Sequence, residues 1–508
     1  MGNISNNYVP AQTAYSRVFL IEGRARPDHS AQYASSLKMT GLSQNFGDVT
    51  KIEMPDPQNY GKFLEVGSIR GAKERLTTSL VGRYAGSVKS ALLRMARNGC
   101  PVDVQLHMGE CQDPSIENDF SKAVILENVV LTTYSTEDLG ALGTDENAKA
   151  DETIEISASD AYEVTPMSFA RKADDIVATQ VLDVTVADSA SCGTCGFESD
   201  GCKLVLAICK TPGGSASTPP DIIYSKDKGA TWRAEDIDTI TTALDPTGVA
   251  GVGKYAVVIA KAVTIYGIHY AFLSDFQNGI DPTFTRVSTG FVLPGVPNGI
   301  SSFGRGAYIV GDWGYVYLTN DPTAGVSVLD AGSLTSSNLT CVHALNQDCA
   351  LAGGNDGTIL YTLNQTAWSQ TASIPVGIGV NITTVYMKSK TEWWVGTSNG
   401  KLYYTTNSGG SWTQKVLPGT TQTKITDIKM PTPSVMFVAG IIAGPRGKLY
   451  RSFDGGNTFV VLPESIGSMP LADEFTALGS CAYDPDFIVA VGLHDNGSDG
   501  VIVVGNGQ

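Results

Sequence analysis

The sequence predicts an all-β chain with two domains: an N-terminal β-sandwich or barrel with one helix, followed by a seven-bladed β-propeller. Composition is the first reason, because 55 glycines and a charged content of 17% in 508 residues are typical of many short strands joined by turns. A repeat is the second: the pattern of Gly447–Phe459 occurs almost residue for residue at Gly400–Trp412. A chain this long exceeds the usual size of one core, so more than one unit is expected.

Charge and targeting features exclude several classes of protein. The net charge of −16 argues against a protein that grips nucleic-acid phosphates, since that affinity comes from clustered Lys and Arg. No run of 18 or more apolar residues occurs, so no transmembrane helix is expected. Met1–Asn6 lacks the basic and apolar regions of a signal peptide, and Asn6 stands where a myristoylation signal needs Ser or Thr. We therefore expect an unexported protein with no membrane insertion.

Nine cysteines are present, and one cluster has a spacing that suggests chemistry. Cys192, Cys195, Cys202 and Cys209 fall close together, but the second CxxC pair typical of zinc sites is absent. Cys209 lies in an apolar run, where a buried thiol is the simplest interpretation. Free thiols are the first expectation, ahead of a local disulfide from Cys192 or Cys195 to Cys202, with zinc third.

The first domain, residues 1–172, contains no repeat but has three strand patterns. Val102–Met108 and Thr153–Ser159 alternate apolar and polar residues, which predicts strands with one buried face. Ala123–Tyr134 is a long run rich in β-branched residues.

One helix and one long loop complete the prediction for this domain. Apolar residues recur at helical spacing from Ser87, a suitable N-cap, to Asn98, where an Asn-Gly pair ends the segment. Asp138–Glu152 is an acidic, Gly-containing loop that is long for a simple hairpin, and we interpret it as an arm between subunits.

The first domain resembles the tail tube proteins of long-tailed bacteriophages. The residues that carry this resemblance are Leu131–Ser135, the following Asp138–Leu142, and the alternating strand through Ile154 and Ile156. The resemblance implies a virion protein, made in the host cytoplasm, whose hexameric rings stack into a DNA-conducting tube with other tail proteins as partners. An acidic composition suits this expectation, since a cationic lumen would retain the phosphates. The alternative is an unrelated β-domain that anchors the second domain.

The second region, residues 173–508, repeats with the period of a propeller blade. Glycines open the copies at Gly314, Gly357, Gly400 and Gly447, with spacings of 43, 43 and 47 residues. Periods of this size with several strands per copy indicate a β-propeller. The domain boundary is therefore placed after residue 172, in a connector before the first repeat.

Three copies contain the loop pattern Ser/Thr-x-Asp-x-Gly-x-Thr-Trp, called an Asp-box. Its Asp or Asn accepts hydrogen bonds from the loop's backbone N–H groups, its Gly supplies a positive φ, and its final aromatic residue packs between sheets. Asn407 and Phe459 depart from the strict pattern but keep these roles. The pattern positions are Ser225, Asp227, Gly229 and Trp232; Thr405, Asn407, Gly409 and Trp412; and Ser452, Asp454, Gly456 and Phe459.

Seven blades are predicted, with six as the alternative. The chain ends after the third strand of the last blade, so the outer strand of that blade has to come from elsewhere. We predict that Asp175–Val186 supplies it and closes the ring, which leaves no open sheet edge. The preceding blades end near Trp232, Phe284, Val328, Trp368, Trp412 and Phe459.

This region resembles the Asp-box propellers, a group that includes sialidases, sortilin-like receptors and photosystem II assembly factors. The blades that read Gly-Lys-Leu-Tyr from Gly400 and Gly447 are most similar to the last kind. The resemblance covers the whole second region and implies the propeller fold.

The sequence predicts no enzyme, no cofactor and no metal. A sialidase needs an arginine cluster and a Tyr/Glu pair, whereas Arg233 and Arg451 fall beside or inside Asp-boxes, on the outer rim of a propeller. The five histidines never fall at metal-ligand spacing. Asp227 and Asp454 lack the acidic neighbours of a calcium site, so hydrogen bonding within their own loops is the expected role.

The leading hypothesis is a structural virion protein: a tail-tube-like domain forms homo-oligomeric rings, and an exterior propeller serves for decoration or adhesion. The alternative is a non-enzymatic propeller that binds carbohydrate or protein on a virion or cell surface. Trp393 and Trp394 are the candidate contacts to a host glycan or a partner, because clustered aromatic rings supply binding surface. A glycosidase is the third hypothesis, and hydrolysis of a sialoside is not expected.

Overall fold

In the computed structural model the chain forms two compact units, Met1–Pro166 and Met167–Gln508. No helix in the part of the chain that the structure describes is long and apolar enough to cross a membrane. In the first unit the structure describes the strands given below. In the second unit it describes residues 167–172, 180–187, 203–210, 221–235, 237, 244–262, 267–287, 295–371, 374, 379–419, 421–443, 446–462, 474–482, 484–494 and 499–507.

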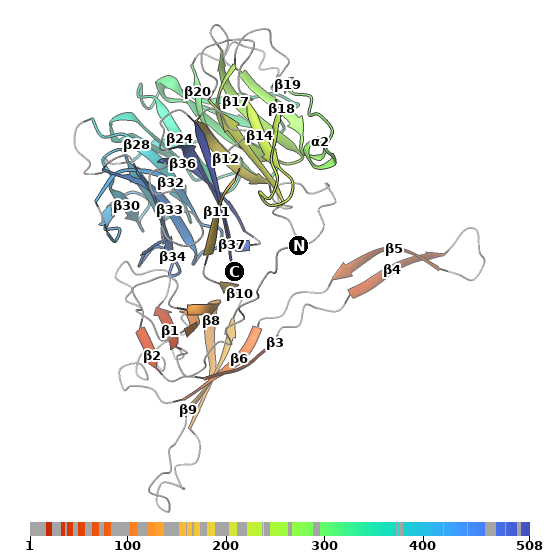
Figure 1. The fold of residues 1–508 in the computed structure, drawn as a ribbon, viewed down its shortest axis with the longest axis vertical. Coiled ribbons are helices and arrows are strands. Elements are labelled where there is room, and N and C mark those ends of the chain that lie inside the picture. Colours follow the sequence, from red (N-terminus) through yellow and green to blue (C-terminus); the bar gives the residue numbers. More distant parts are fainter. Residues whose placement is uncertain are drawn as a thin grey trace, which may run out of the picture. The chain divides into compact units, whose positions relative to one another are not determined.

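The described part of the first unit is an antiparallel sheet with the strand order β2-β1-β7-β8-β9-β6-β3, together with a separate pair, β4 and β5 (Figure 1). The 17-residue strand β8 pairs with β7 and β10 along its first half and with β9 along its second half. The bounds are β1 (Arg17–Glu22), β2 (Gln32–Ser35), β3 (Lys38–Ser43), β4 (Val49–Pro55), β5 (Phe63–Arg70), β6 (Leu76–Gly82), β7 (Val102–Gly109), β8 (Phe120–Thr136), β9 (Glu152–Ala158) and β10 (Asp160–Val164).

The three strands predicted in this unit are confirmed as β7, β8 and β9, and each contains a buried apolar side chain: Val104, Leu126 and Ile154. The predicted helix from Ser87 to Asn98 lies outside the described residues, as does the acidic loop between β8 and β9. The tail-tube-like architecture therefore stays a prediction.

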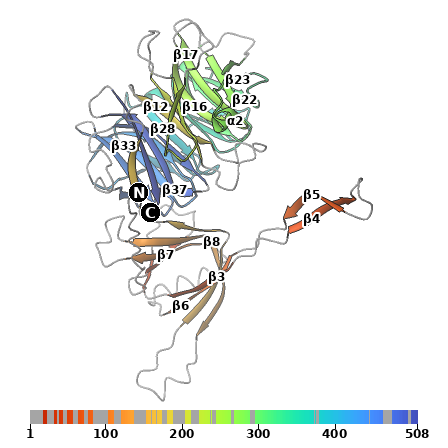
Figure 2. The same cartoon turned by 45° about the vertical axis from the view of Figure 1, so that its right-hand side comes forward.

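The second unit is a seven-bladed β-propeller, as predicted, because it consists of seven four-stranded antiparallel sheets (Figure 2). The innermost strands of blades one to seven are β12 (Val181–Ala187), β16 (Leu244–Val252), β20 (Pro297–Phe303), β24 (Leu339–Ala344), β28 (Ile382–Met387), β32 (Gln422–Lys429) and β36 (Glu474–Cys481). The second strands are β13 (Leu204–Cys209), β17 (Tyr255–Ala262), β21 (Gly306–Gly311), β25 (Ala350–Gly354), β29 (Trp393–Thr397), β33 (Met436–Ile442) and β37 (Asp484–Leu493).

The third strands are β14 (Ile222–Ser225), β18 (Gly267–Phe272), β22 (Tyr315–Thr319), β26 (Ile359–Thr362), β30 (Leu402–Thr405), β34 (Arg446–Ser452) and β38 (Gly500–Gly507). The outer strands are β15 (Arg233–Glu235), β19 (Thr285–Arg286), β23 (Ser327–Ala331), β27 (Trp368–Gln370), β31 (Thr413–Lys415), β35 (Val460–Val461) and β11 (Met167–Lys172). Among the described residues of this unit, short helices occupy three connections: α2 (Leu273–Asn278), η4 (Asp312–Gly314) and η5 (Asn355–Gly357).

The ring closes in two ways. Each innermost strand contacts the next, and β36 contacts β12. The outer strand of blade seven is β11, which pairs antiparallel with the C-terminal strand β38 from Met167↔Gly507 to Lys172↔Ile502. The predicted closing segment Asp175–Val186 is therefore wrong, since its described part belongs to β12, the innermost strand of blade one. The unit boundary likewise falls after Pro166 rather than after residue 172.

Every innermost strand has a bulge at the same position, where one extra residue interrupts its register with the second strand. In five blades the side chain of the extra residue donates a hydrogen bond of 2.5–3.0 Å to a backbone carbonyl of the following blade's innermost strand. We call these bonds the inter-blade ladder. The ladder fixes the spacing of adjacent blades around the axis. Its donors are Thr247, Asn298, Thr340, Thr383 and Thr476.

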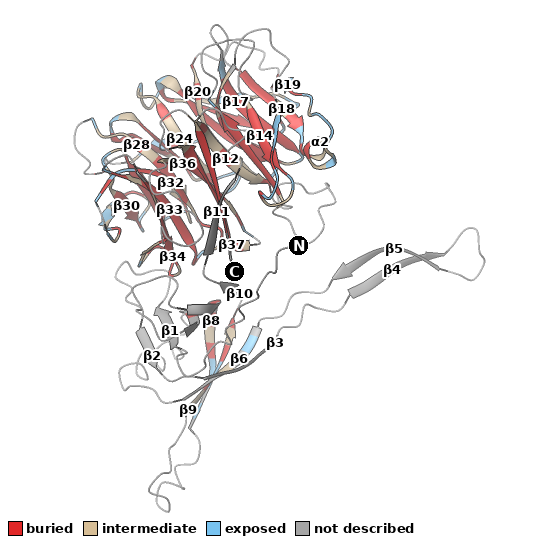
Figure 3. Cartoon of the chain, in the orientation of Figure 1, coloured by how far each residue is buried: buried red, intermediate tan, exposed pale blue. Residues whose placement is uncertain are grey.

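Both faces of most sheets are covered by neighbouring blades, so the second and third strands are apolar throughout rather than alternating (Figure 3). In β13 and β25 every residue is buried. The aromatic residues that end the third-to-fourth strand connections complete these interfaces: Trp232 packs between blades one and seven, and Trp368 between blades three and four.

Blades six and seven are joined by a buried ion pair. The Arg451 side chain of β34 is fully buried and its Nη2 donates to Oδ1 of Asp486 in β37. The guanidinium also lies 4.5 Å from the ring centroid of Phe453 and 5.3 Å from that of Phe437. Aromatic faces and a carboxylate therefore replace the water that this charge loses on folding.

A buried histidine in blade two makes the stability of the propeller sensitive to acid. His269 is fully buried, neither ring nitrogen has a hydrogen-bond partner in the described part of the chain, and burial followed by the charge of Arg286 lowers its pKa from 6.5 to about 4. The unfolded chain therefore binds this proton more tightly than the folded chain does. The contribution of His269 is complete above pH 6.5 and is lost as the pH falls to about 4.

We expect this loss to amount to about 3 kcal/mol of the free energy of unfolding. Urea denaturation of the wild type and of His269→Leu between pH 7.5 and 4 measures it, because the difference between the two pH profiles isolates this residue. Asp183, whose pKa is raised to about 6, acts in the opposite direction in both proteins and cancels in that difference. Parallel profiles would contradict the prediction.

Candidate functional site

The three Asp-boxes share one hydrogen-bond circuit. In blade one, Ser225 Oγ donates to Asp227 Oδ1 at 2.8 Å and accepts the N–H of Gly229 at 2.7 Å, while Asp227 accepts the N–H and the hydroxyl of Thr231. Burial alone raises the pKa of Asp227, but the bonds from Thr231 and Ser225 bring it below its usual value. Both carboxylate oxygens are thus used inside the loop, and the box is an architectural element.

The boxes of blades five and six repeat this circuit with small changes. In blade six Asp454 accepts the N–H and the hydroxyl of Thr458 at 2.8 and 2.6 Å. In blade five Asn407 Oδ1 accepts the N–H of Ser411, and its amide nitrogen donates to the Ser411 hydroxyl at 3.0 Å. The amide therefore replaces the carboxylate because a serine hydroxyl can accept as well as donate.

Trp393 and Trp394 are not surface residues. Their exposed fractions are 0% and 2%, so the predicted contact with a glycan or partner is wrong. They lie on β29, whose two faces are both covered by neighbouring blades, so both alternate positions are buried. Each instead packs on an Asp-box glycine: a Cβ on Gly456 would lie 2.5 Å from the Trp394 ring, and one on Gly409 would lie 3.1 Å from Trp393.

The innermost strands bring a charged cluster to the axis of the propeller. Asp427 on β32 forms a 3.2 Å ion pair with Lys429, accepts the Thr384 hydroxyl from blade five at 3.1 Å, and accepts the N–H of Leu478 from blade seven at 2.8 Å. Burial alone lowers the pKa of Lys429, but Asp427 and Asp183 raise it above its usual value. The ammonium group therefore stays charged.

Asp183 and His343 also accept backbone hydrogen bonds from a neighbouring blade. Asp183 accepts the N–H of Val249 in blade two at 3.0 Å, and burial raises its pKa to about 6. His343 Nδ1 accepts the N–H of Met387 in blade five at 3.1 Å, and its ring lies 4.0 Å from that of Tyr386. Burial followed by Lys429 lowers the pKa of His343 to about 3, so the imidazole is neutral.

Perturbed pKa values in a cluster suggest catalysis, but ion-pair networks that hold a fold together produce them as well. Here each carboxylate accepts backbone N–H groups across a blade boundary, which assigns it to the cohesion of the ring. Burial also raises the pKa of the nearby Cys341 thiol to about 12, so no thiolate forms there. The described residues contain no group of three side chains that could hold a metal ion.

The turns between second and third strands carry an exposed tryptophan. Trp313, in η4 of blade three, is 56% exposed and adopts φ 55 and ψ 30. Its N–H is bonded to Asn338 Oδ1 at 3.0 Å, and Asn298 Nδ2 donates to Asp312 at 3.0 Å. Asp356 of blade four has the same backbone conformation, and its N–H is bonded to Asn381 Oδ1. The conformation of the turn therefore recurs in both blades, and the large apolar side chain is what distinguishes blade three.

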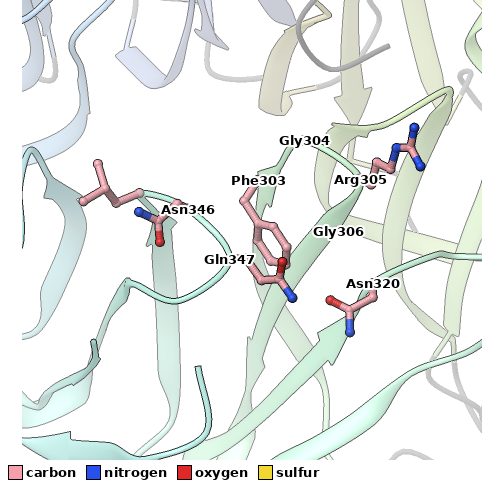
Figure 4. A pocket seen from close by; sticks show the side chains of 8 residues that line it. Phe303, Gly304, Arg305, Gly306, Asn320, Asn346 and Gln347 are labelled. Atoms are coloured by element: carbon pink, nitrogen blue, oxygen red, sulfur yellow. The ribbon is translucent and has the colours of Figure 1, made fainter. Parts of the chain in front are cut away.

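The opposite end of blades three and four has a cavity of about 550 Å³. The hairpin tips of both blades line it, together with Asn320 at the start of blade three's third-to-fourth connection. Figure 4 shows the Phe303 ring standing between Asn346 and Asn320, with the Arg305 guanidinium off to one side. Its lining residues are Phe303, Gly304, Arg305, Gly306, Asn320, Leu345, Asn346 and Gln347.

Sequence reasoning missed these features, although two left a trace. Trp313 stands in Gly-Asp-Trp-Gly, a sequence that predicts a tight turn, and turns lie at the surface. The Thr donors of the inter-blade ladder recur with the interval of the blades. The cavity has no signal in the sequence, since it depends on how two hairpin tips pack together.

No protein-family model and no curated protein matches the sequence of this chain. Solved structures similar to it include YCF48 from Cyanidioschyzon merolae, with a TM-score of 0.47 and 16% identity over 66% of this chain and 98% of that one. YCF48 bound to a D1 peptide has a TM-score of 0.49 and 15% identity over 68% and 98%. The GH74 xyloglucanase of Xanthomonas campestris has a TM-score of 0.44 and 14% identity over 66% of this chain and 53% of that one. At these values the comparisons carry no argument about function, and the propeller assignment rests on the sheet topology.

Proposed function

We propose that the protein is a non-enzymatic binding protein whose propeller contacts a protein partner through the face of its second-to-third strand turns. The observation that carries this proposal is Trp313. Tryptophan is among the residues that dominate binding energy at protein interfaces. A side chain of this size that is more than half exposed on a rigid turn buries a large area on contact and loses little conformational freedom.

Two features support a preformed contact rather than a mobile loop. The left-handed backbone of Trp313 is sparsely populated for residues other than glycine and persists only where the surroundings hold it. Those surroundings are tight, because a Cβ on Gly314 would lie 2.1 Å from the Thr335 carbonyl oxygen and one on Gly332 would lie 2.3 Å from that of Trp313.

Replacing Trp313 by alanine should weaken partner binding by about 2–4 kcal/mol, which is roughly 30-fold or more. The measurement is quantitative mass spectrometry of the proteins that co-purify with the full chain from the cells that produce it, followed by titration of the partner so identified. Val416→Ala is the matched control, since Val416 is 81% exposed and also apolar. Equal loss with both variants, or no loss with Trp313→Ala, would refute the proposal.

A second candidate is that the first unit polymerises into tail-tube-like rings on a virion, with the propeller outside and DNA passing through the lumen. What supports it is the broad antiparallel sheet around the long strand β8, with β4 and β5 as a separate two-stranded sheet, together with the net charge of −16. Negative-stain microscopy of the purified full chain tests it. Rings or tubes are expected, and a monodisperse monomer at all concentrations would rule the tube role out.

A further inference from the structure

The third-to-fourth strand connection has a second structural task in most blades. In blades one, two, four, five and six, a backbone N–H of this connection donates a hydrogen bond to a backbone carbonyl of the same blade, in the segment that joins the first strand to the second. We call this bond the clamp. The loop thereby folds back over the tip and fills the space there. The five bonds, of 2.7–3.1 Å, are Lys228 to Lys203, Leu273 to Lys254, Gln365 to Asp348, Ser408 to Thr391 and Gly455 to Ser434.

Blade three lacks this clamp for a covalent reason. In the Asp-box and Asp-box-like blades the donor stands three residues after the Ser or Thr that opens the loop, as Lys228 follows Ser225. Counting from Thr319 in blade three, that position is Pro322, which has no N–H to donate. The Thr319 hydroxyl instead bonds to the Gly325 carbonyl at 2.9 Å, and Asp321 accepts two bonds from Thr323. The hairpin tip at Phe303 is left uncovered, and the cavity lies there.

The aromatic floor of the cavity is fixed in place. A Cβ on Gly306 would lie 2.5 Å from the Phe303 ring, so only glycine lets the ring lie flat against the strand. The ring also contacts Tyr308 at an interplanar angle of 51°, with centroids 5.2 Å apart, and the Tyr308 hydroxyl donates to the Gln347 carbonyl at 2.6 Å. Phe303 therefore offers a preformed apolar surface to the open side.

The rim of the cavity is polar, and three of its four polar side chains are uncharged. Asn346 Oδ1 accepts the N–H groups of Asp348 and Cys349, which leaves its amide nitrogen to donate. Within the described chain, the amides of Asn320 and Gln347 have no hydrogen-bond partner and are open to a ligand. Amides both donate and accept, as sugar hydroxyl groups do. No carboxylate or thiol lines the cavity, so it holds no general acid or nucleophile.

We propose that this cavity binds a neutral pyranose residue of a carbohydrate without hydrolysing it. The apolar face of the sugar ring stacks on Phe303, and Asn320, Asn346 and Gln347 hydrogen-bond its hydroxyl groups. The volume falls within the range of small-molecule sites. The site lies at the opposite end of the strands from Trp313 and is independent of the protein contact proposed above.

The test uses the full chain and four free probes: the methyl pyranosides of glucose, galactose and mannose, and methyl glucuronide. Saturation-transfer NMR should detect at least one neutral pyranoside, and titration should show that Phe303→Ala weakens it by about tenfold or more. Gln347→Ala should weaken it less. Lys390→Ala is the control, because Lys390 is a cation in the first hairpin turn of blade five, as Arg305 is in blade three, but it does not line the cavity, and this variant should bind like the wild type.

Each other outcome overturns the proposal. Binding of the glucuronide alone, lost in Arg305→Ala, would make the cavity an anion site. Neutral binding that survives Phe303→Ala would place the sugar elsewhere, and transfer to none of the probes would exclude a pyranose. Phe303→Leu, which keeps an apolar side chain against Tyr308, distinguishes loss of stacking from loss of folding when its thermal midpoint matches that of the wild type. Loss of sugar binding leaves the Trp313 contact intact, and the reverse also holds.

Discussion

A chain that begins at Ala173 is expected to lose about 3–6 kcal/mol of unfolding free energy relative to one that begins at Met167. The two chains differ only by β11, which contributes six residue pairs to the last blade. A backbone hydrogen bond adds about 1 kcal/mol net, and the removal of this strand also exposes β38 as an open edge. Guanidinium denaturation of both chains measures the difference.

The pair of chains also separates the effect of β11 from any effect of the first unit, because neither chain contains β1–β10. The shorter chain should in addition associate with concentration, since an unpaired edge is a template for another strand. Identical denaturation midpoints and identical sedimentation would show that the contact of β36 with β12 closes the ring alone.

Asp486→Ala is expected to destabilise the propeller by about 3–5 kcal/mol, because it leaves the Arg451 guanidinium buried without its carboxylate. The double variant Arg451→Met with Asp486→Leu should regain most of that loss, since it removes both charges and keeps apolar volume beside Phe437 and Phe453. The measurement is the free energy of unfolding of the full chain, read from the tryptophan fluorescence of the propeller.

Lys228→Ala is the control for this pair. The Lys228 ammonium lies 3.3 Å from a carboxylate oxygen of Asp484, which is on β37 like Asp486, but both side chains of this pair are about one-third exposed. A solvated ion pair of this kind contributes little, so a change below about 1 kcal/mol is expected. If Lys228→Ala and Asp486→Ala lowered the free energy of unfolding by similar amounts, burial would not be the reason that the Arg451–Asp486 pair matters.

The propeller could be predicted because its evidence is local and repeated. Glycines at the blade interval and loops such as Ser225–Trp232 determine their own hydrogen bonds, so the sequence of each copy is enough. The strand β11 could not be found in this way, because Met167–Lys172 belongs to no repeat and its partner lies at the far end of the chain. Trp393 and Trp394 illustrate a third case: adjacent aromatics imply one exposed side chain only when a sheet has one free face, and β29 has none.

Only two residues separate the last strand of the first unit from the first strand of the second. Strand β10 ends at Val164 and β11 begins at Met167, so a load that pulls the first unit away from the propeller acts directly on β11. The load enters at Met167, which pairs with Gly507 at the end of β38. Mechanical tension between the units would be felt first as the opening of blade seven.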